Sequence, residues 1–327
     1  MLNRMGSTRV YVKGVLDVVG FPIADVSDHL AREDTVVWVD LCDPTKAQLD
    51  ELAEELGLHE LAVEDALGPH QRPKLDHYAS HKFLVCHAAR FDRERSTLET
   101  TEIDAFVNER WLITVRKNEA FSMGSVKARW DRSPDLAVHG VSFLLYGLLD
   151  VVVDGYFGAV NRFDDFYDKV SDELFAEQPM TPAEQQVWFT TRRALMQFRR
   201  LVGPIREAIS GLMRRELDAI DEDMYPYYQD VYDHVIRVNE STDALRDLVS
   251  TLVETNLSLR DYRANQIMKL VTSWAAIIAV PTLITGWYGM NLPYPGSGET
   301  WGVWAAAGLV IALSAGLYVL FKRRDWL

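Results

Sequence analysis

The chain has 327 residues, with 48 Asp and Glu against 34 Lys and Arg, which gives a formal net charge of −14 at pH 7. This balance disfavours nucleic acid and anionic lipid as partners and favours cations, although ordinary solubility explains an acidic surface equally well. The only cysteines, Cys42 and Cys86, lack CxxC spacing, which excludes a readable disulfide framework or zinc ribbon. The sequence contains no Walker-A motif, no G-x-G-x-x-G loop and no HExxH pair, so it predicts neither an organic cofactor nor an enzyme.

Residues 1–140 alternate strand-like and helix-like patterns, which predict a mixed α/β domain with a sizeable core. Thr45, followed three positions later by Gln48, predicts a capping box that opens an amphipathic helix, and HELAVEDAL predicts a second, shorter helix. Runs rich in β-branched and aromatic residues predict the strands TRVYVKGV, TVVWVDLCD, HKFLVCHAARF, TEIDAFVNE and RWLITVRK. We expect the last two to form a hairpin that turns near residues 108–110, and the strand order stays open.

Residues 141–225 have a helical pattern and are rich in Asp and Glu. A first long helix is predicted to end at the segment EQPM, and a second to begin after Thr181. Pro182 suits the first helical position, and Glu184 completes a capping box with Thr181. Gly203-Pro204 predicts a bend in the second helix. These features predict an antiparallel helical pair that lies beside the α/β domain.

A stalk helix is predicted over residues 226–268, continuous with a following apolar segment. From Tyr227 to Val280 there are 54 residues without Gly or Pro, enough for a helix of roughly 80 Å. Apolar residues recur every seven positions at Val231, Val238, Leu245, Leu252 and Leu259. The companion positions, Val235, Thr242, Val249 and Asn256, are only half apolar. This mixed seam favours a ring of helices, in which one edge of each helix contacts neighbouring chains and the other faces a water-filled axis. The alternative is a long helix packed inside one globular domain.

Two apolar segments, 269–288 and 301–321, each contain a charge-free run close to the roughly 20 residues that cross a bilayer, and we identify no other run of this length. The connecting loop, 289–300, has no Lys or Arg, whereas basic residues lie on the other side of each span, including the tail 322–327. By the positive-inside rule both termini are cytoplasmic, with the spans in the cell (inner) membrane. The predicted fold class is therefore an α+β membrane protein: an N-terminal α/β domain, a long helix continuous with the first transmembrane helix, and a C-terminal transmembrane hairpin.

Three stretches of this sequence resemble the CorA family of magnesium transporters. They are YGMN at 288–291 with the short loop, final span and basic tail after it, VEDALGPHQRPK at 63–74, and QDVYDHVIRVNESTDALRDLVS at 229–250. The resemblance implies passive uptake of hydrated Mg²⁺, with Co²⁺ and Ni²⁺ as further candidates, driven by the membrane potential. It also implies a homopentamer with a central pore; the residues themselves require only an oligomer, because two spans cannot enclose a pore.

The external motif is the candidate selectivity site. Asn291 offers an amide whose carbonyl can accept hydrogen bonds from the waters that Mg²⁺ releases reluctantly. A ring of carboxylates would hold the ion too tightly for release. Gly289, after Tyr288, allows a close backbone approach or a positive φ where the helix ends, and Met290 is expected to position the turn. The alternative is a simple helix cap and turn.

One face of the first span is the candidate pore lining and gate. Its residues follow three-four spacing: Met268, Val271, Ala275, Ala279, Thr282 and Gly286. We expect Thr282 and the carbonyls near Gly286 to contact a hydrated ion, and Asn265 to form a polar ring one turn below. The resemblance places the gate at Met268 and Val271, which would close by dewetting. A packing or lipid-facing stripe is the alternative.

Glu64 and Asp65 resemble the family's regulatory metal ligands, and Asp230 resembles their partner from the adjoining subunit. Carboxylates that converge across an interface repel one another until a divalent ion joins them, so bound intracellular Mg²⁺ would hold the closed state. The weaker candidates are Asp164, Asp165 and Glu254. Two other functions stay open: a zinc-preferring transporter of the same family, and a membrane-anchored sensor or scaffold without transport.

Overall fold

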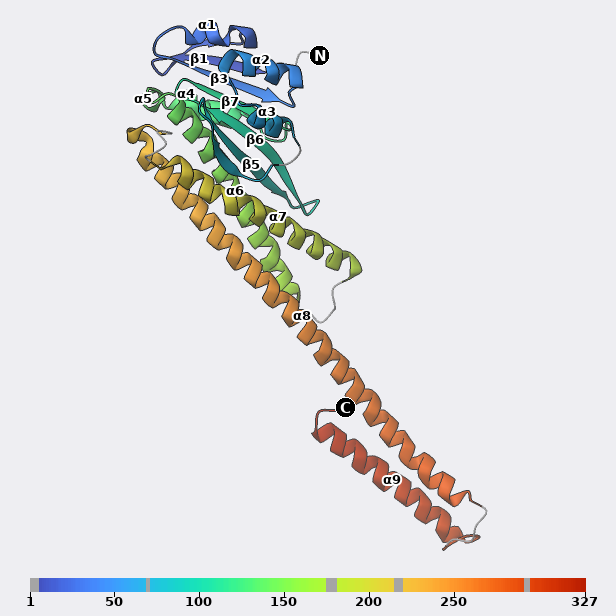
Figure 1. The fold of residues 1–327 in the computed structure, drawn as a ribbon. Coiled ribbons are helices and arrows are strands. Elements are labelled where there is room, and N and C mark those ends of the chain that lie inside the picture. The colour runs from blue at the N-terminus through green and yellow to red at the C-terminus, as the bar shows by residue number, and fades with distance from the viewer. Residues whose placement is uncertain (1–5, 69–70, 175–180, 215–219, 291–294) are drawn as a thin grey trace. The chain divides into compact units, whose positions relative to one another are not determined.

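The computed structural model describes residues 6–68, 71–174, 181–214, 220–290 and 295–327 (Figure 1). The chain divides into two compact units, Met1–Val249 and Ser250–Leu327. Helix α8, Tyr225–Tyr288, contributes residues to both units. The absence of Gly and Pro over most of its length predicted this helix, and the prediction is confirmed.

The first unit contains a seven-stranded sheet in the order β2-β1-β3-β7-β6-β5-β4. Only β3 and β7 pair in parallel; the other neighbours are antiparallel. Four of the five predicted strand runs form, and β6 and β7 make the predicted hairpin around residues 108–110. The fifth run, TRVYVKGV, is broken by a turn at Lys13 and Gly14, which separates β1 from β2. Two strands were not predicted: β2, which follows β1 after a two-residue turn, and β4, whose short, polar pattern has no apolar alternation. The strands are β1 Ser7–Val12, β2 Val15–Val19, β3 Thr35–Cys42, β4 Lys74–His77, β5 Lys82–Asp92, β6 Thr97–Val107 and β7 Trp111–Arg116.

One face of the sheet is covered by η1 Ile23–Asp25, α1 Val26–Leu30, α2 Lys46–Leu56 and α3 Glu60–Leu67 (Figure 1). The capping box of α2 is present: the Thr45 side chain accepts from the Gln48 amide, and the Gln48 side chain accepts from the Thr45 amide at 2.9 Å. Alternate residues of the strands, such as Phe83, Val85 and Phe106, pack on the apolar sides of these helices. The core on this face therefore fixes α3, which carries two predicted site residues.

The other face carries α4 Gly124–Arg132, α5 Pro134–Ala137, α6 Val141–Leu174 and α7 Pro182–Leu212 (Figure 1). The capping box of Thr181 and Glu184 opens α7 as predicted. Although Asp150 and Asp154 exclude it from the charge-free runs predicted as spans, helix α6 is also long and apolar enough to cross a membrane. However, 67% of its most apolar window is buried inside the protein. The apolar character of α6 is thus explained by packing on the sheet and its neighbouring helices.

The N-terminal part of α8, which follows η3 Glu222–Met224, packs within its own chain. The seven-residue seam and its companion positions are both buried, from Val231 to Val249, and Thr242 is 0% exposed. The Thr242 hydroxyl donates to the Val238 carbonyl at 2.7 Å, which satisfies this buried polar group. An ion pair of 2.7 Å joins Arg199 of α7 to Asp243 of α8. The expectation that this seam faces other chains and a wet axis is therefore wrong here, because α6 and α7 supply the partner surface.

The second unit contains the C-terminal part of α8 and helix α9, Thr300–Arg323. Both are long and apolar enough to span a membrane, with 11% and 0% of their most apolar windows buried. Helix α9 lies alongside α8 (Figure 1), and Gly302 near its start is close enough to Gly296 that a Cβ there would meet the Gly296 carbonyl oxygen. Two apolar helices this exposed are stable only where lipid or further chains cover them.

Candidate functional site

The predicted pore-lining residues lie together on one exposed face of α8. Asn265, Met268, Val271, Ala275, Ala279, Thr282 and Gly286 are all exposed, with Met268 at 65% and Val271 at 59%. At about 3.6 residues per turn, these positions fall on one side of the helix. Ser273 and Ile284, which are buried, fall on the opposite side. The face is therefore turned away from the side of α8 that packs within this unit.

Large apolar residues flank this face on both sides. Trp274 and Ile278 lie along one border, Leu283 and Trp287 along the other, and all four are exposed. Between them the stripe formed by Ala275, Ala279, Thr282 and Gly286 carries small or polar side chains. Large aliphatic and aromatic side chains suit positions that face lipid, whereas small residues suit close contact between helices or a polar path. The arrangement accommodates neighbouring helices at the borders and an open stripe between them.

Thr282 presents a hydrogen-bond acceptor on this stripe. Its hydroxyl donates to the Ile278 carbonyl at 3.0 Å, one turn earlier in the same helix. The donor is thus used, and the oxygen lone pairs stay available. Water molecules held by a cation point their hydrogens outward, so they require acceptors. Thr282 therefore has the chemistry expected for contact with a hydrated cation.

Helix α8 ends at Tyr288, directly before Gly289, Met290 and Asn291. The Gly289 amide donates to the Thr285 carbonyl at 2.8 Å, and the Met290 amide to the Trp287 carbonyl at 3.3 Å. A Cβ at Gly289 would lie 3.1 Å from the Thr285 oxygen of the same helix end, and the φ of Gly289 is not positive, so a positive φ is not the reason for glycine at this position. Met290 is 40% exposed. Asn291 lies outside the described residues.

The predicted acidic sites have contrasting surroundings. Glu64 on α3 is exposed, while Asp65 is half-buried and accepts from Lys74 of β4 at 2.7 Å. Hydrogen bonds and charges of Asp65 and Asp76 raise the pKa of Lys74 against the lowering effect of burial, so this amine stays charged. The Lys74 ammonium already compensates the negative charge of Asp65 within the chain. A divalent ion at Asp65 would compete with the Lys74 ammonium.

Asp230 is exposed on α8, and its carboxylate lies 3.7 Å from Nε2 of His234, one turn later. It belongs to no group of three metal-ligating side chains among the described residues, and neither do Glu64 and Asp65. Asp164, Asp165 and Glu254 are exposed and likewise stand outside such groups within the described segments. Because Asp230 is expected to meet Asp65 of another subunit, its role stays a prediction.

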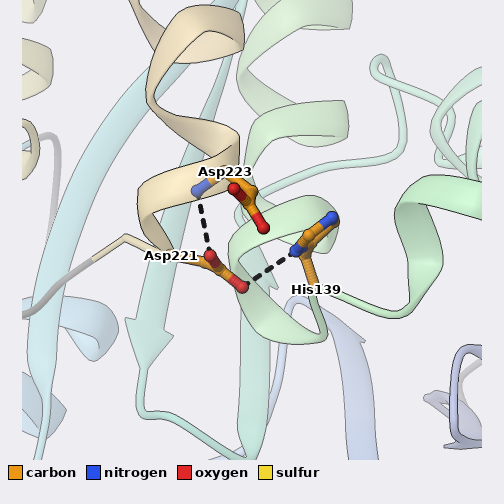
Figure 2. Close-up of side chains that lie close together, drawn as sticks. All are labelled: His139, Asp221 and Asp223. Carbon is orange, nitrogen blue, oxygen red and sulfur yellow. Dashed lines mark hydrogen bonds and ion pairs between the residues drawn. The ribbon is translucent and has the colours of Figure 1, made fainter.

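A His-Asp-Asp cluster not predicted from the sequence lies at the start of α8 (Figure 2). His139 Nδ1 lies 2.9 Å from the Asp221 carboxylate, whose other oxygen accepts from the Asp223 amide at 3.0 Å. These hydrogen bonds lower the pKa of Asp221. His139 and Asp221 are 82 positions apart in the sequence, so no local pattern could have indicated the contact. The contact joins the loop before α6 to the turn that starts α8.

A second cluster was also missed: Asp150 and Asp154 on α6 with His234 on α8. Asp150 is buried and forms an ion pair with Arg129 of α4, which also lies 3.7 Å from Asp154. The two aspartates are one helical turn apart in an otherwise apolar run, which is a signal that sequence reading could have used. Arg129 already supplies their positive partner.

These features define a class: an α/β protein with two C-terminal apolar helices joined by a short connection, and a stripe of small and polar residues on the first of them. The family model for the CorA-like Mg²⁺ transporter protein matches residues 33–323, and the chain belongs to this family. The predicted family and fold class are thereby confirmed.

Similar proteins cover nearly the whole chain. The cobalt/magnesium transport protein CorA of Thermotoga maritima is 29% identical over 313 residues, 94% of this chain and 88% of the relative. The putative metal ion transporter YfjQ of Bacillus subtilis is 32% identical over 292 residues, 88% of this chain and 89% of the relative. The solved structure of the CorA magnesium transporter from Methanocaldococcus jannaschii matches with a TM-score of 0.79 at 21% identity, covering 100% of both chains.

Proposed function

We propose that this chain is one subunit of a homopentameric channel in the cell membrane that admits hydrated Mg²⁺, with Co²⁺ and Ni²⁺ as further substrates. The observation that carries the proposal is the exposed face of α8 from Met268 to Gly286, which includes the stripe and lies opposite the buried residues Ser273 and Ile284. Membership of the CorA-like family supports this assignment. One chain cannot surround a pore with a single face of one helix, so several copies must place this stripe around an axis.

In this proposal the spans are residues 269–288 and 301–321, both termini are cytoplasmic, and residues 1–140, 141–225 and 226–268 form the cytoplasmic part. Asn291 forms the outer collar together with the turn at Tyr288, Gly289 and Met290. Ala279, Thr282 and Gly286 line the path, Met268 and Val271 form the gate, and Asn265 lies at the inner mouth. No nucleotide is needed, since a divalent cation that moves inward gains roughly 4.6 kcal/mol per 100 mV of membrane potential.

Transport is tested with the full chain in lipid vesicles. With an inside-negative potential, we expect Mg²⁺ influx that saturates and that Co²⁺ reduces by competition. Vesicles without protein supply the background. A flux of Zn²⁺ larger than that of Mg²⁺ would transfer the assignment to a zinc-preferring member of the family, and the absence of any divalent flux would favour a membrane-anchored sensor or scaffold.

We propose that Glu64 and Asp65 of one subunit and Asp230 of the next bind intracellular Mg²⁺ and thereby hold the channel closed. In one chain these carboxylates are exposed or paired with a single lysine. They can therefore bind a cation together with carboxylates of a second copy. Carboxylates brought together without a cation repel one another, which would separate the subunits when Mg²⁺ is low.

We expect Asp230→Lys to reduce the protection from protease that Mg²⁺ gives to the cytoplasmic part of the full-length protein. The lysine replaces a ligand and places a positive charge at the site, so the protective Mg²⁺ concentration should rise at least tenfold, about 1.4 kcal/mol. Asp233→Lys, which makes the same change of charge on an exposed residue three positions later, is the matched control. Equal shifts in both variants would reduce the effect to general electrostatics and remove Asp230 from the sensor.

A further inference from the structure

Four titratable side chains form a polar cluster on the α3 face of the sheet. They are His87 of β5, Glu102 and Asp104 of β6, and Lys117, which directly follows β7. Residues two apart on a strand point to the same face, so Glu102 and Asp104 share the face of Phe106, which packs in the α3 core. Antiparallel pairing places His87 opposite Glu102. The cluster therefore continues the apolar core toward one end of α3.

The two carboxyl groups of this cluster are buried and incompletely paired. Asp104 is 0% exposed and Glu102 is 5% exposed. Glu102 Oε2 accepts from the Gln71 amide at 2.8 Å, but within the described residues Glu102 Oε1 and both Asp104 oxygens have no hydrogen-bond donor. A single ammonium, Lys117 Nζ, lies 3.6 Å from Glu102 Oε1 and 3.6 Å from Asp104 Oδ2. His87 Nε2 lies 3.5 Å from Glu102 Oε2 and adds a charge only when protonated, so with neutral His87 the two carboxylates share one cation.

The Lys117 ammonium is also bound elsewhere. It donates to the carbonyls of Ala66 and Gly68 at the C-terminal end of α3, the second at 2.8 Å. A cation is favourable at this end of a helix, where carbonyls lack partners. With its donors used in this way, Lys117 cannot compensate two buried negative charges. A buried carboxylate without full compensation takes up a proton instead of staying ionised.

We propose that Glu102 and Asp104 hold one proton between them at neutral pH, and that this proton competes with a divalent cation bound at Glu64 and Asp65. The inference rests on the proposed regulatory role of Glu64 and Asp65, which lie on α3 next to the carbonyls held by Lys117. When the proton leaves, the cluster gains one negative charge beneath α3. The added charge strengthens cation binding there, and a bound cation in turn promotes loss of the proton.

The electrostatics of Asp104 agree with this arrangement. Burial raises the pKa of Asp104 to about 8, the charges of Glu102 and Asp65 add to the rise, and Lys117 opposes it. A cation that neutralises Asp65 would remove one of the causes of the raised pKa. Within the described part of the chain, the charged and titratable groups around Asp104 are Glu102 on its own strand, Cys86 and His87 on β5, Lys117 after β7, and Asp65 on α3.

The first test measures stability against pH. Because the pKa of Asp104 is about 8 in the folded protein and about 3.9 when unfolded, the folded state alone holds the proton between these values. The free energy of unfolding therefore falls as pH rises from about 4 to about 8. We expect Asp104→Asn, which imitates the protonated carboxyl, to remove this part of the fall and to raise the Tm of the full-length protein at about pH 8.

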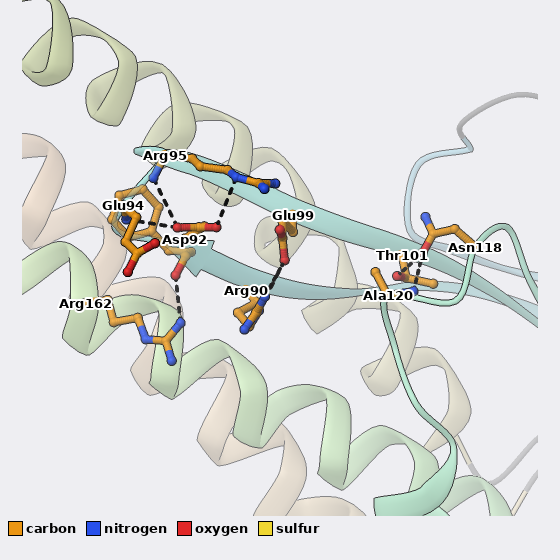
Figure 3. Close-up of polar contacts among 10 residues, drawn as sticks. Arg90, Asp92, Glu94, Arg95, Glu99, Thr101, Asn118, Ala120 and Arg162 are labelled. Atoms are coloured by element: carbon orange, nitrogen blue, oxygen red, sulfur yellow. Dashed lines mark hydrogen bonds and ion pairs between the residues drawn. The ribbon is translucent and has the colours of Figure 1, made fainter.

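The matched control is Glu99→Gln on the same strand. Glu99 pairs with Arg90 at 2.8 Å at a more exposed position (Figure 3). This variant should keep the pH dependence of the wild type. If Asp104→Asn and the wild type lose Tm equally between about pH 6 and about pH 8, the proton site does not exist.

The second test measures the coupling to Mg²⁺. Full-length wild-type protein should need roughly fivefold less Mg²⁺ for half-maximal protection from protease at about pH 9 than at about pH 7, a window in which ordinary carboxylates do not titrate. Asp104→Asn should need the same Mg²⁺ at both pH values, at the level of the wild type at the lower pH. Glu99→Gln should behave as the wild type does.

Infrared absorption of protonated carboxyl groups separates the possible failures. The wild type should lose one such signal in this pH window, and Asp104→Asn should lack it. A wild type without a titrating carboxyl signal would overturn the proton site. A signal that titrates while the Mg²⁺ midpoint stays constant would overturn the coupling alone. If Mg²⁺ fails to protect the wild type at every pH, both the proposed regulatory site and the competition are wrong. The infrared signal of the protonated carboxyl group still tests the buried proton in that case.

Discussion

Asn291→Ala is expected to reduce Mg²⁺ influx into vesicles at least tenfold, which corresponds to about 1.4 kcal/mol. In the proposed channel each subunit contributes one amide to a collar at the outer end of α8. Each amide carbonyl accepts a hydrogen bond from the hydration shell of the ion, and a net hydrogen bond is worth about 0.5–1.5 kcal/mol. Since every copy carries the substitution, the loss is repeated around the ring.

The change should affect the ion path and leave the fold intact. The backbone hydrogen bond at the end of α8, from the Gly289 amide to the Thr285 carbonyl at 2.8 Å, does not involve the side chain that is replaced. Asn291→Asp, which retains the acceptor and adds a charge, should bind the cation more tightly and lower the maximal flux, because a conducting site must release its ion. The oligomer of both variants should elute as the wild type does in size-exclusion chromatography.

Ser297→Ala is the matched control for Asn291→Ala, since it removes a polar group from an exposed residue of the same loop. We expect its flux to equal that of the wild type. Wild-type flux in Asn291→Ala would contradict the collar and favour the interpretation of Gly-Met-Asn as a helix end and turn. A loss of flux in both variants would indicate that the whole loop, rather than the amide, determines conduction.

Local chemistry made much of the fold predictable. The two capping boxes, at Thr45 with Gln48 and at Thr181 with Glu184, each place a side-chain acceptor within reach of an amide three residues away, so a short sequence pattern determines the contact. The long α8 followed from the absence of residues that break helices. The strands followed from β-branched runs, but their order did not, because pairing joins segments as distant as β3 and β7.

The packing of α8 shows where a pattern is insufficient. A seven-residue repeat indicates which side of a helix is buried, but not whether the covering surface belongs to the same chain. Val231, Val238 and Leu245 are covered within the unit, and the half-polar Thr242 is tolerated because its hydroxyl bonds to its own helix. Similarly, the apolar α6 reads as a membrane span by composition, and only its burial distinguishes a core helix from a span.

The candidate sites divide in the same way. The exposed stripe on α8 lies on one helix, so its three-four spacing was sufficient to predict it. The cluster of His87, Glu102, Asp104 and Lys117 combines residues of β5, of β6 and of the position after β7, and its importance lies in burial and missing partners. Neither the burial of these side chains nor their lack of hydrogen-bond partners can be read from a sequence. Asp65 was predicted as a ligand, whereas its ion pair with Lys74 depends on how β4 lies beside α3.

Replacing the apolar ring that we propose at the cytoplasmic end of the span should produce a channel that does not close. We expect Met268→Ser combined with Val271→Ser to retain flux at Mg²⁺ concentrations that close the wild type. Both side chains are exposed on the proposed pore face, at 65% and 59%. A constriction lined with apolar groups empties of water and stops ions, whereas serine hydroxyls hold water in place. The residual flux under closing conditions should rise roughly tenfold, the equivalent of about 1.4 kcal/mol.

Ile267→Ser tests whether position on the helix determines this effect. Ile267 is exposed at the same depth but lies about 100° around the helix from Met268, outside the proposed path. Its closing should match that of the wild type. Adding Asp230→Lys to the double serine variant should change the residual flux little. A constriction that stays hydrated conducts ions whether or not the regulatory site holds Mg²⁺. Closure of the double variant at the wild-type Mg²⁺ concentration would place the gate elsewhere on α8, whereas a leak from Ile267→Ser alone would show that the pore faces a different side of this helix.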